Sequence, residues 1–279
     1  MGFLEILEKS AYDAGNIACF GLDPVAEKIP IKGGTEGRIT AFYTKILDAM
    51  AAADCLPAAV KPNLAFYEQY GLDGLLALKN VMQQCRKLKL PVILDAKRGD
   101  IDKSSAAYAK AIFGHWAADA VTVNPFLGHD SVLPFLEYCR DGKGVYILAR
   151  TSNKGALDFQ DLKIGSQPLF MEVARKILAW HVDGIGAVVG ATEIEELQRL
   201  AAFFADGTKP VALLVPGVGA QGGQAKDVMK VLAKSGTPWL HRINSSSAIA
   251  FAYEHTGKDD YAGAAVTAMK ALAKETKFS

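Results

Sequence analysis

The strongest constraint on the fold of this chain is a regular alternation of short apolar segments with longer amphipathic ones. The apolar segments lack the polar alternation of a half-exposed strand, which is typical of a parallel sheet buried on both faces. We predict eight strands, at residues 17–23, 58–63, 91–97, 120–125, 144–150, 184–191, 210–217 and 238–246. We predict eight helices between and after them, near 36–53, 70–88, 103–114, 130–140, 168–181, 193–204, 224–234 and 259–274, with one further helix at the start.

Eight strand–helix units in about 260 residues favour a (β/α)8 TIM barrel, and we predict a single domain over residues 1–279. A doubly wound open sheet is the alternative, because the pattern alone does not show closure. In such a barrel the chemistry lies at the carboxyl ends of the strands. Polar and charged residues follow these predicted ends: Asp23, Lys61, Asn63, Asp95, Lys97, Asn124, Ser152, Asn153, Gln221 and Asn244 to Ser247. This concentration at one rim indicates an enzyme.

Composition and charge exclude several other classes of protein. Half of the residues are hydrophobic, and 31 basic side chains balance 30 acidic ones, which argues against a disordered chain. A formal net charge of +1 argues against a protein that binds nucleic acid or a membrane surface, because such proteins usually carry a large excess of basic residues. No segment has the length of a membrane span or the pattern of a signal peptide. Four widely spaced cysteines are typical of reduced thiols in a cytoplasmic protein, and no zinc motif is present.

The sharpest motif is Asp95-x-Lys97-x-x-Asp100, directly after the predicted strand 91–97. Residues 95 and 97 point to the same side of a strand, so both side chains are expected to enter the barrel mouth. Carboxylates around one ammonium would hold a charged lysine as a proton donor. By spacing alone, a solvated charge cluster fits equally well.

Lys61 and Asp23 also end predicted strands, and each has more than one interpretation. Lys61 fits a rim residue, a member of the same charge array, or a Schiff-base nucleophile. Asp23 fits a turn former before Pro24, or an acceptor for sugar hydroxyls.

A glycine-rich segment, Pro216 to Gly223, contains a literal G-x-G-x-x-G. A dinucleotide-binding fold requires an acidic residue about 20 positions later, and none lies between Asp227 and Glu254. After a seventh barrel strand, the segment instead predicts a phosphate cradle of backbone N–H groups. Ser245, Ser246 and Ser247 follow the eighth strand, where they fit either helix caps or the same anion pocket.

Taken together, these motifs resemble the orotidine 5'-monophosphate decarboxylase family, specifically its longer bacterial branch. The resemblance covers nearly the whole chain. It rests on Gly21-Leu22-Asp23-Pro24, Lys61-Pro62-Asn63, Asp95-x-Lys97-x-x-Asp100-Ile101, Ala149 to Asn153 and Pro216 to Gly222. It implies a homodimer in the cytoplasm that uses no metal and no organic cofactor and converts orotidine 5'-monophosphate (OMP) to uridine 5'-monophosphate (UMP).

The resemblance also implies roles for individual residues. Lys61, Asp95, Lys97 and Asp100 match the family's charge network, in which Lys97 would protonate C6 of the pyrimidine and Asp100 would reach the partner's active site. Asp23, Asn63 and Ser104 match ribose contacts, Ser152 matches a pyrimidine contact, and Gln221 matches the side chain that bridges base and phosphate. The remaining residues expected to bind the substrate are Ile101, Pro216, Gly222, Ser246 and Ser247.

One departure from the family pattern concerns the phosphate. Family members usually carry an arginine in a motif like N-S-S-R after the last strand, and this chain has Ser247 there. Arg242, five residues earlier, is poorly placed as a substitute. Two alternatives stay open at this stage. One is a related, metal-dependent sugar-phosphate decarboxylase or synthase barrel, and the other is a nucleotide-binding barrel with reduced turnover.

Overall fold

A computed structural model describes residues 1–219, 222–255 and 260–278. Eight parallel strands form one sheet, in the order β2-β1-β10-β9-β8-β5-β4-β3. Parallel bridges from Val60 to Val92 and from Asn63 to Asp95 join the two ends of that order, so the sheet closes into a barrel. The barrel strands are β1 (Ala18–Gly21), β2 (Ala59–Lys61), β3 (Ile93–Arg98), β4 (Ala120–Val123), β5 (Gly144–Arg150), β8 (Ile185–Val189), β9 (Ala212–Val215) and β10 (Arg242–Ser245). The predicted barrel is confirmed, whereas the single domain stays a prediction.

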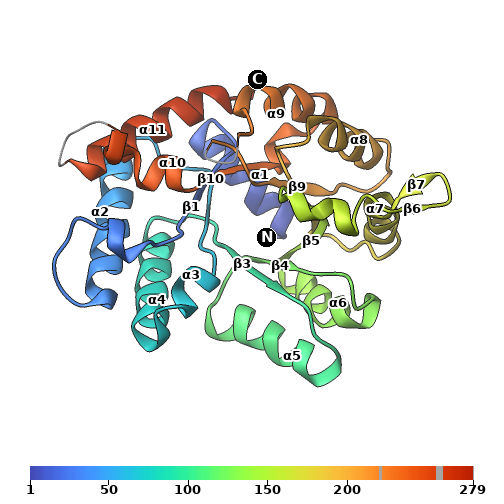
Figure 1. Cartoon of the computed structure of the whole chain (residues 1–279), viewed down its shortest axis with the longest axis horizontal. Coiled ribbons are helices and arrows are strands. Elements are labelled where there is room, and N and C mark those ends of the chain that lie inside the picture. The colour runs from blue at the N-terminus through green and yellow to red at the C-terminus, as the bar shows by residue number, and fades with distance from the viewer. Residues whose placement is uncertain (220–221, 256–259, 279) are drawn as a thin grey trace.

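The longer helices surround the strands, as Figure 1 shows. Their apolar faces pack on the outside of the sheet, and the residues of the strands are almost all buried. They are α2 (Thr35–Ala52), α4 (Gly71–Lys87), α5 (Asp102–Lys110), α6 (His129–Leu136), α7 (Leu169–Ala179), α8 (Ile194–Ala205), α9 (Ala225–Leu232) and α11 (Tyr261–Glu275). Burial on both faces explains why the strands show no polar alternation in the sequence.

The extra N-terminal helix, α1 (Phe3–Ala14), closes the amino-terminal end of the barrel. Its Phe3 and Leu7 are fully buried and pack with Tyr146 and other inward-facing strand residues. A Cβ atom at Gly144, the first residue of β5, would overlap the ring of Phe3, so this close approach requires glycine there. Because α1 fills one end, a ligand can enter the barrel only at the opposite, carboxyl end of the strands.

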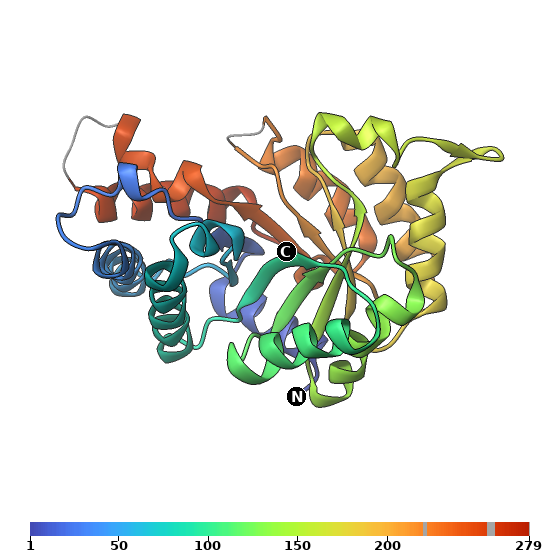
Figure 2. The same cartoon turned by 60° about the horizontal axis from the view of Figure 1, so that its bottom comes forward.

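Several short elements were missed by the sequence pattern. The predicted strand 238–246 begins with a 3-10 turn, η6 (Pro238–Leu240), because proline fixes its own φ and offers no N–H to a ladder. A hairpin of β6 (Lys163–Ile164) and β7 (Gln167–Pro168) projects from the barrel (Figures 1 and 2). Each of its strands has only two residues, which is too short to show a periodic pattern in the sequence. Two short helices follow barrel strands, α3 (Ala65–Glu68) after β2 and α10 (Ser247–Ala250) after β10.

Further single turns connect the main elements. They are η1 (Ala26–Lys28), the π-helical turn η2 (Ala111–His115), η3 (Glu137–Asp141), η4 (Lys154–Asp158), η5 (Ala233–Ser235) and η7 (Ala252–His255). Two of them, η1 and η7, lie against each other, because Lys28 in η1 forms an ion pair with Glu254 in η7. No helix among the described residues is long and apolar enough to cross a membrane.

Candidate active site

A cavity of about 520 Å³ opens at the carboxyl ends of the barrel strands. The lining residues come from seven of the eight barrel strands or from the segments that follow them. The lining residues are Asp23, Val25, Lys28, Lys61, Asn63, Phe66, Asp95, Lys97, Thr151, Ser152, Asn153, Val188, Pro216, Gly217, Val218, Asn244, Ser246, Ser247 and Phe251. Such a concave site, apolar in part and with convergent polar groups, has the form of a small-molecule site.

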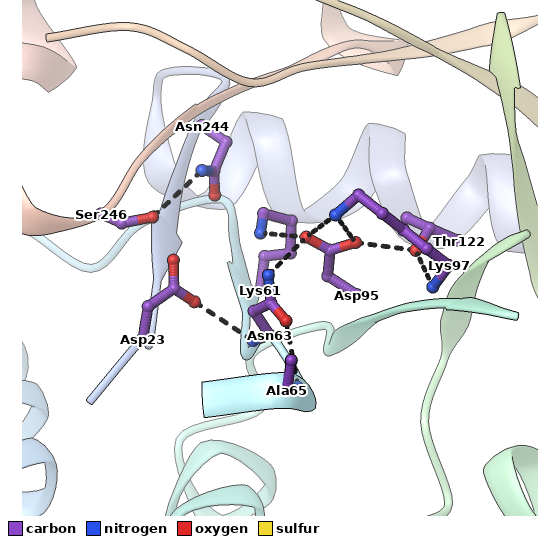
Figure 3. A network of polar contacts seen from close by, with 9 residues as sticks. All are labelled: Asp23, Lys61, Asn63, Ala65, Asp95, Lys97, Thr122, Asn244 and Ser246. Carbon is purple, nitrogen blue, oxygen red and sulfur yellow. Dashed lines mark hydrogen bonds and ion pairs between the residues drawn. The ribbon is translucent and has the colours of Figure 1, made fainter. Parts of the chain in front are cut away.

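The carboxylate of Asp95 is the centre of the polar network in this cavity (Figure 3). Lys61 Nζ lies 2.8 Å from Asp95 Oδ2, and Lys97 Nζ lies 2.7 Å from Oδ1 and 2.9 Å from Oδ2. Thr122 Oγ1 donates a hydrogen bond to Oδ1 at 2.8 Å. The side chains of Asp95 and Lys61 are only 7% and 4% exposed, whereas that of Lys97 is 46% exposed. One ammonium is therefore buried behind the carboxylate and the other is open to the cavity.

The two lysines keep Asp95 ionised. Burial alone would raise the pKa of this carboxyl, but the charges of Lys61 and Lys97 outweigh it and hold the pKa well below its usual range. Burial would likewise lower the pKa of Lys61, but the carboxylates of Asp95 and Asp23 raise it above the ordinary value. Asp95 is therefore a carboxylate and Lys61 an ammonium group at neutral pH.

Lys97 is held in an unusual backbone conformation. Its φ is +44°, in the left-handed region that non-glycine residues rarely adopt. Its N–H donates to Thr122 Oγ1 at 2.9 Å, and the same oxygen donates to Asp95. The hydroxyl of Thr122, which is buried on β4, thus fixes both the backbone of Lys97 and its counter-ion. Thr122 was not among the predicted site residues, although its polar side chain in an otherwise apolar strand was a signal.

Asp23 and Asn63 lie beside this array. Asn63 N donates to Asp23 Oδ1 at 3.1 Å, and Asn63 Nδ2 lies 3.5 Å from Asp95 Oδ2. The second oxygen of Asp23 receives no hydrogen bond from the residues drawn in Figure 3. Both side chains line the cavity and are half-buried, so they can meet polar groups of a ligand.

The ends of β9 and β10 form the other side of the cavity. Asn244 Nδ2 donates to Ser246 Oγ at 3.3 Å, and Ser246 packs so closely on Gly21 that a Cβ atom there would overlap its hydroxyl. Within the described residues, the buried Oδ1 of Asn244 receives no hydrogen bond. Ser247 begins α10 and also lines the cavity.

The loop after β5 brings Thr151, Ser152 and Asn153 to the wall of the cavity. Thr151 Oγ1 donates to Asn153 Oδ1 at 2.6 Å, and Thr151 N donates to the side chain of Gln160 at 2.8 Å. Ser152 O accepts a hydrogen bond from Thr192 at 3.3 Å. These bonds order the loop so that neutral donors and acceptors face the cavity.

The structure places most of the predicted site residues around one cavity. Those that line it are Asp23, Lys61, Asn63, Asp95, Lys97, Ser152, Pro216, Ser246 and Ser247. Asp100, Ile101, Ser104 and Gly222 do not line it, and Gln221 lies outside the described residues. Ile101 and Ser104 instead border a shallow depression on the outer surface. Lys28 and Phe251 line the cavity but were not predicted, because both lie in short turns without a recognisable motif.

Arg242 lies at the opposite end of the barrel from the cavity. It is fully buried and donates to the carbonyl oxygens of Leu7, Trp239 and His241 at 2.6 to 2.9 Å and to Ser10 Oγ at 2.6 Å. A side chain engaged in this way cannot reach a ligand at the cavity. No group of three or more acidic, histidine or cysteine side chains in the described ranges is arranged to hold a metal ion.

Fold and site together define a barrel enzyme with an alternating lysine–carboxylate–lysine array at its mouth. A family model described as "Orotidine 5'-phosphate decarboxylase / HUMPS family" matches residues 18–250. The chain is 38% identical over 280 residues to the orotidine 5'-phosphate decarboxylase of Delftia acidovorans, covering 97% of this chain and 96% of the relative. It is 40% identical over 253 residues to that of Thermomicrobium roseum, covering 88% and 86%.

Solved structures also resemble this chain. The Leishmania donovani OMP decarboxylase is 31% identical with a TM-score of 0.78, and the match covers 99% of both chains. The Leishmania donovani UMP synthase is 34% identical with a TM-score of 0.79, and the match covers 98% of this chain but 56% of that longer one. The chain belongs to the orotidine 5'-phosphate decarboxylase / HUMPS family, and the resemblance inferred from the sequence is confirmed.

Proposed function

We propose that this chain is an orotidine 5'-phosphate decarboxylase that converts OMP to UMP in pyrimidine biosynthesis, with Lys97 as the proton donor. The family membership supports the reaction, and one observation in particular supports the role of Lys97. Its ammonium is bonded to an ionised, buried carboxylate and is also open to the cavity. A charged lysine in that position can both stabilise a carbanion and protonate it.

The chemistry begins with loss of carbon dioxide from C6 of the pyrimidine. The bond between C6 and the carboxylate breaks, its electron pair stays on C6, and neutral carbon dioxide leaves. The resulting vinylic carbanion is poorly delocalised by the ring, so a positive charge fixed beside C6 lowers the barrier. Lys97 Nζ then transfers one proton to C6 and gives UMP. Asp95 positions the ammonium group of Lys97, and Lys61 in turn anchors the carboxylate of Asp95.

The other lining residues are proposed to bind the remainder of OMP. Asp23 and Asn63 would accept and donate hydrogen bonds to the ribose hydroxyls, and Ser152 would meet the edge of the pyrimidine. Pro216, Ser246 and Ser247 would surround the phosphate at the ends of β9 and β10, which is the usual phosphate site of such barrels. The proposed roles of Gln221 and Gly222 in this pocket rest on the family pattern.

We propose a homodimer in which Asp100 acts in the partner's site, and we keep Ile101 and Ser104 as substrate contacts that the family pattern implies. Ile101 is 50% exposed, and Phe126 and Leu127 on the neighbouring loop after β4 are 78% and 48% exposed. Large apolar side chains exposed on neighbouring loops suit an interface between proteins. Cytoplasmic location is also a proposal, and the four free cysteines suit a reducing compartment.

The decisive experiment is to add OMP to the purified chain and follow the loss of its ultraviolet absorbance. We expect turnover that survives a metal chelator, because protonation by Lys97 needs no Lewis acid. Turnover that stops on chelation would favour a metal-dependent member of the family. Binding of UMP without turnover of OMP would favour the nucleotide-binding barrel and overturn the proposed activity.

A further inference from the structure

Three lysines line the cavity, and one of them takes no part in the array around Asp95. Lys61 and Lys97 are both bonded to that carboxylate. The third, Lys28, lies in η1, the turn after β1, and its side chain is 44% exposed. Among the described lining residues it is therefore the cation whose charge Asp95 does not neutralise.

The ammonium of Lys28 lies against the segment that follows β10. Its Nζ is 2.7 Å from Glu254 Oε2 and 5.5 Å from the centroid of the Phe251 ring. The N–H of Phe251 donates to the carbonyl oxygen of Ser247 at 2.9 Å, which is one helical turn. Residues four apart on such a turn share a face, so Lys28 lies over the face to which Ser247 belongs.

The backbone around Lys28 is fixed by side chains from three other elements. Tyr70 Oη accepts a hydrogen bond from Ala26 N at 2.9 Å, and Arg38 on α2 donates to the carbonyl oxygens of Ala26 and Ile29. Tyr253 in η7 donates to the carbonyl oxygen of Lys28. The backbone that carries the Lys28 ammonium group is therefore ordered, which reduces the entropy cost of binding an anion.

We propose that Lys28 supplies the positive charge that grips the phosphate of the substrate, in place of the arginine that this chain lacks at position 247. The inference rests on the proposed function, because it takes the ends of β9 and β10 as the phosphate site. The serine hydroxyls at that end are neutral, and a phosphate dianion is bound more tightly by a charged donor. In the free enzyme Glu254 is the counter-ion of Lys28, and the phosphate displaces it.

The test compares UMP with uridine, since the two differ only in the phosphate. Calorimetric titration of the Lys28→Met variant should show UMP affinity weakened by roughly 10- to 100-fold and uridine affinity, titrated to millimolar concentration, unchanged. Lys32→Met is the matched control, because Lys32 is exposed on the same loop and does not line the cavity. Circular dichroism checks that each variant is folded. Binding is measured without turnover, so the result stands even if the chain fails to decarboxylate OMP.

Two further variants test whether position 247 and Lys28 serve the same phosphate. Ser247→Arg should raise kcat/KM for OMP, and the gain should be larger in the Lys28→Met background than in the natural chain. Its rate on orotidine, which lacks the phosphate, should stay nearly unchanged. Glu254→Gln should strengthen UMP binding, because it removes the competing carboxylate.

Three results would overturn the proposal. The first is a Lys28→Met variant with unchanged UMP affinity. The second is a variant whose affinities for UMP and uridine fall by the same factor, which would mean that Lys28 shapes the cavity but does not bind the phosphate. The third is an equal effect of Lys32→Met, which would indicate a general electrostatic field.

Discussion

Replacement of Thr122 by valine tests how the proton donor is positioned. Valine keeps the shape of the threonine side chain and removes only its hydroxyl. That hydroxyl donates to Asp95 Oδ1 at 2.8 Å and accepts from Lys97 N at 2.9 Å. The substitution therefore leaves the lysine–carboxylate contacts in place but frees the strained backbone of Lys97, whose φ is +44°.

The expected magnitude follows from these two bonds. A hydrogen bond to a charged group contributes about 1.5–3 kcal/mol and a neutral one about 0.5–1.5 kcal/mol. We therefore expect Thr122→Val to lower the free energy of unfolding by about 2–4 kcal/mol. Displacement of Lys97 Nζ from the reacting carbon should lower kcat by at least about tenfold, because small errors in position are costly in catalysis. KM should change much less, since Thr122 does not line the cavity.

The assay combines urea unfolding with steady-state turnover of OMP. Thr122→Ser is the matched control, because serine restores the hydroxyl and should recover most of kcat. A Thr122→Val variant with natural kcat would refute the idea that this hydroxyl positions Lys97. Equal loss of activity in the serine variant would indicate that the methyl group, through packing, is what matters.

Three further predictions concern other residues. Lys97→Ala should abolish turnover without unfolding the barrel, and retained decarboxylation by the purified variant would remove Lys97 from the mechanism. Mixing Lys97→Ala chains with Asp100→Ala chains should restore some activity if Asp100 serves the partner's site, whereas no recovery under proven subunit exchange would place both residues in one site. Burial, aided by the charge of Arg242, lowers the pKa of His241 to about 3. The unfolded chain therefore binds a proton below about pH 6.5 that the folded chain does not, and this group should cost about 2 kcal/mol of stability between pH 6.5 and 5. Urea unfolding across that range should show the loss, and His241→Gln should flatten it.

The sequence predicted the barrel because its strands are buried on both faces and its motifs follow their carboxyl ends. Asp95 and Lys97 were predicted together for the same reason, since residues two apart on a strand point to one side. The remaining members of the site are brought together by tertiary contacts between segments far apart in the sequence. The buried Lys61 joins the array through a bridge between β2 and β3 that no local pattern encodes.

Lys28 shows the limit of sequence patterns most clearly. It lies in a three-residue turn with no periodicity and no motif, and it reaches the cavity only because η1 packs on η7, more than 220 residues later. For Arg242 the sequence was sufficient. Its position early in the last strand, five residues before Ser247, predicted that it does not bind the phosphate. The structure adds the reason, which is that its guanidinium is engaged at the far end of the barrel.

The contacts of Arg242 also have a consequence for how the chain folds. Its Nη2 donates to the carbonyl oxygen of Leu7, 235 residues earlier, and to the hydroxyl of Ser10. These two hydrogen bonds of the first helix therefore cannot form until the last strand has been made, and closure of so long a loop comes late. The apolar cluster around Phe3 and Leu7 is likewise completed only when Leu240, just before the last strand, has been made. A chain that stops before β10 should consequently leave β1 and β9 without the strand that lies between them and be prone to aggregate, even though it contains Lys61, Asp95 and Lys97.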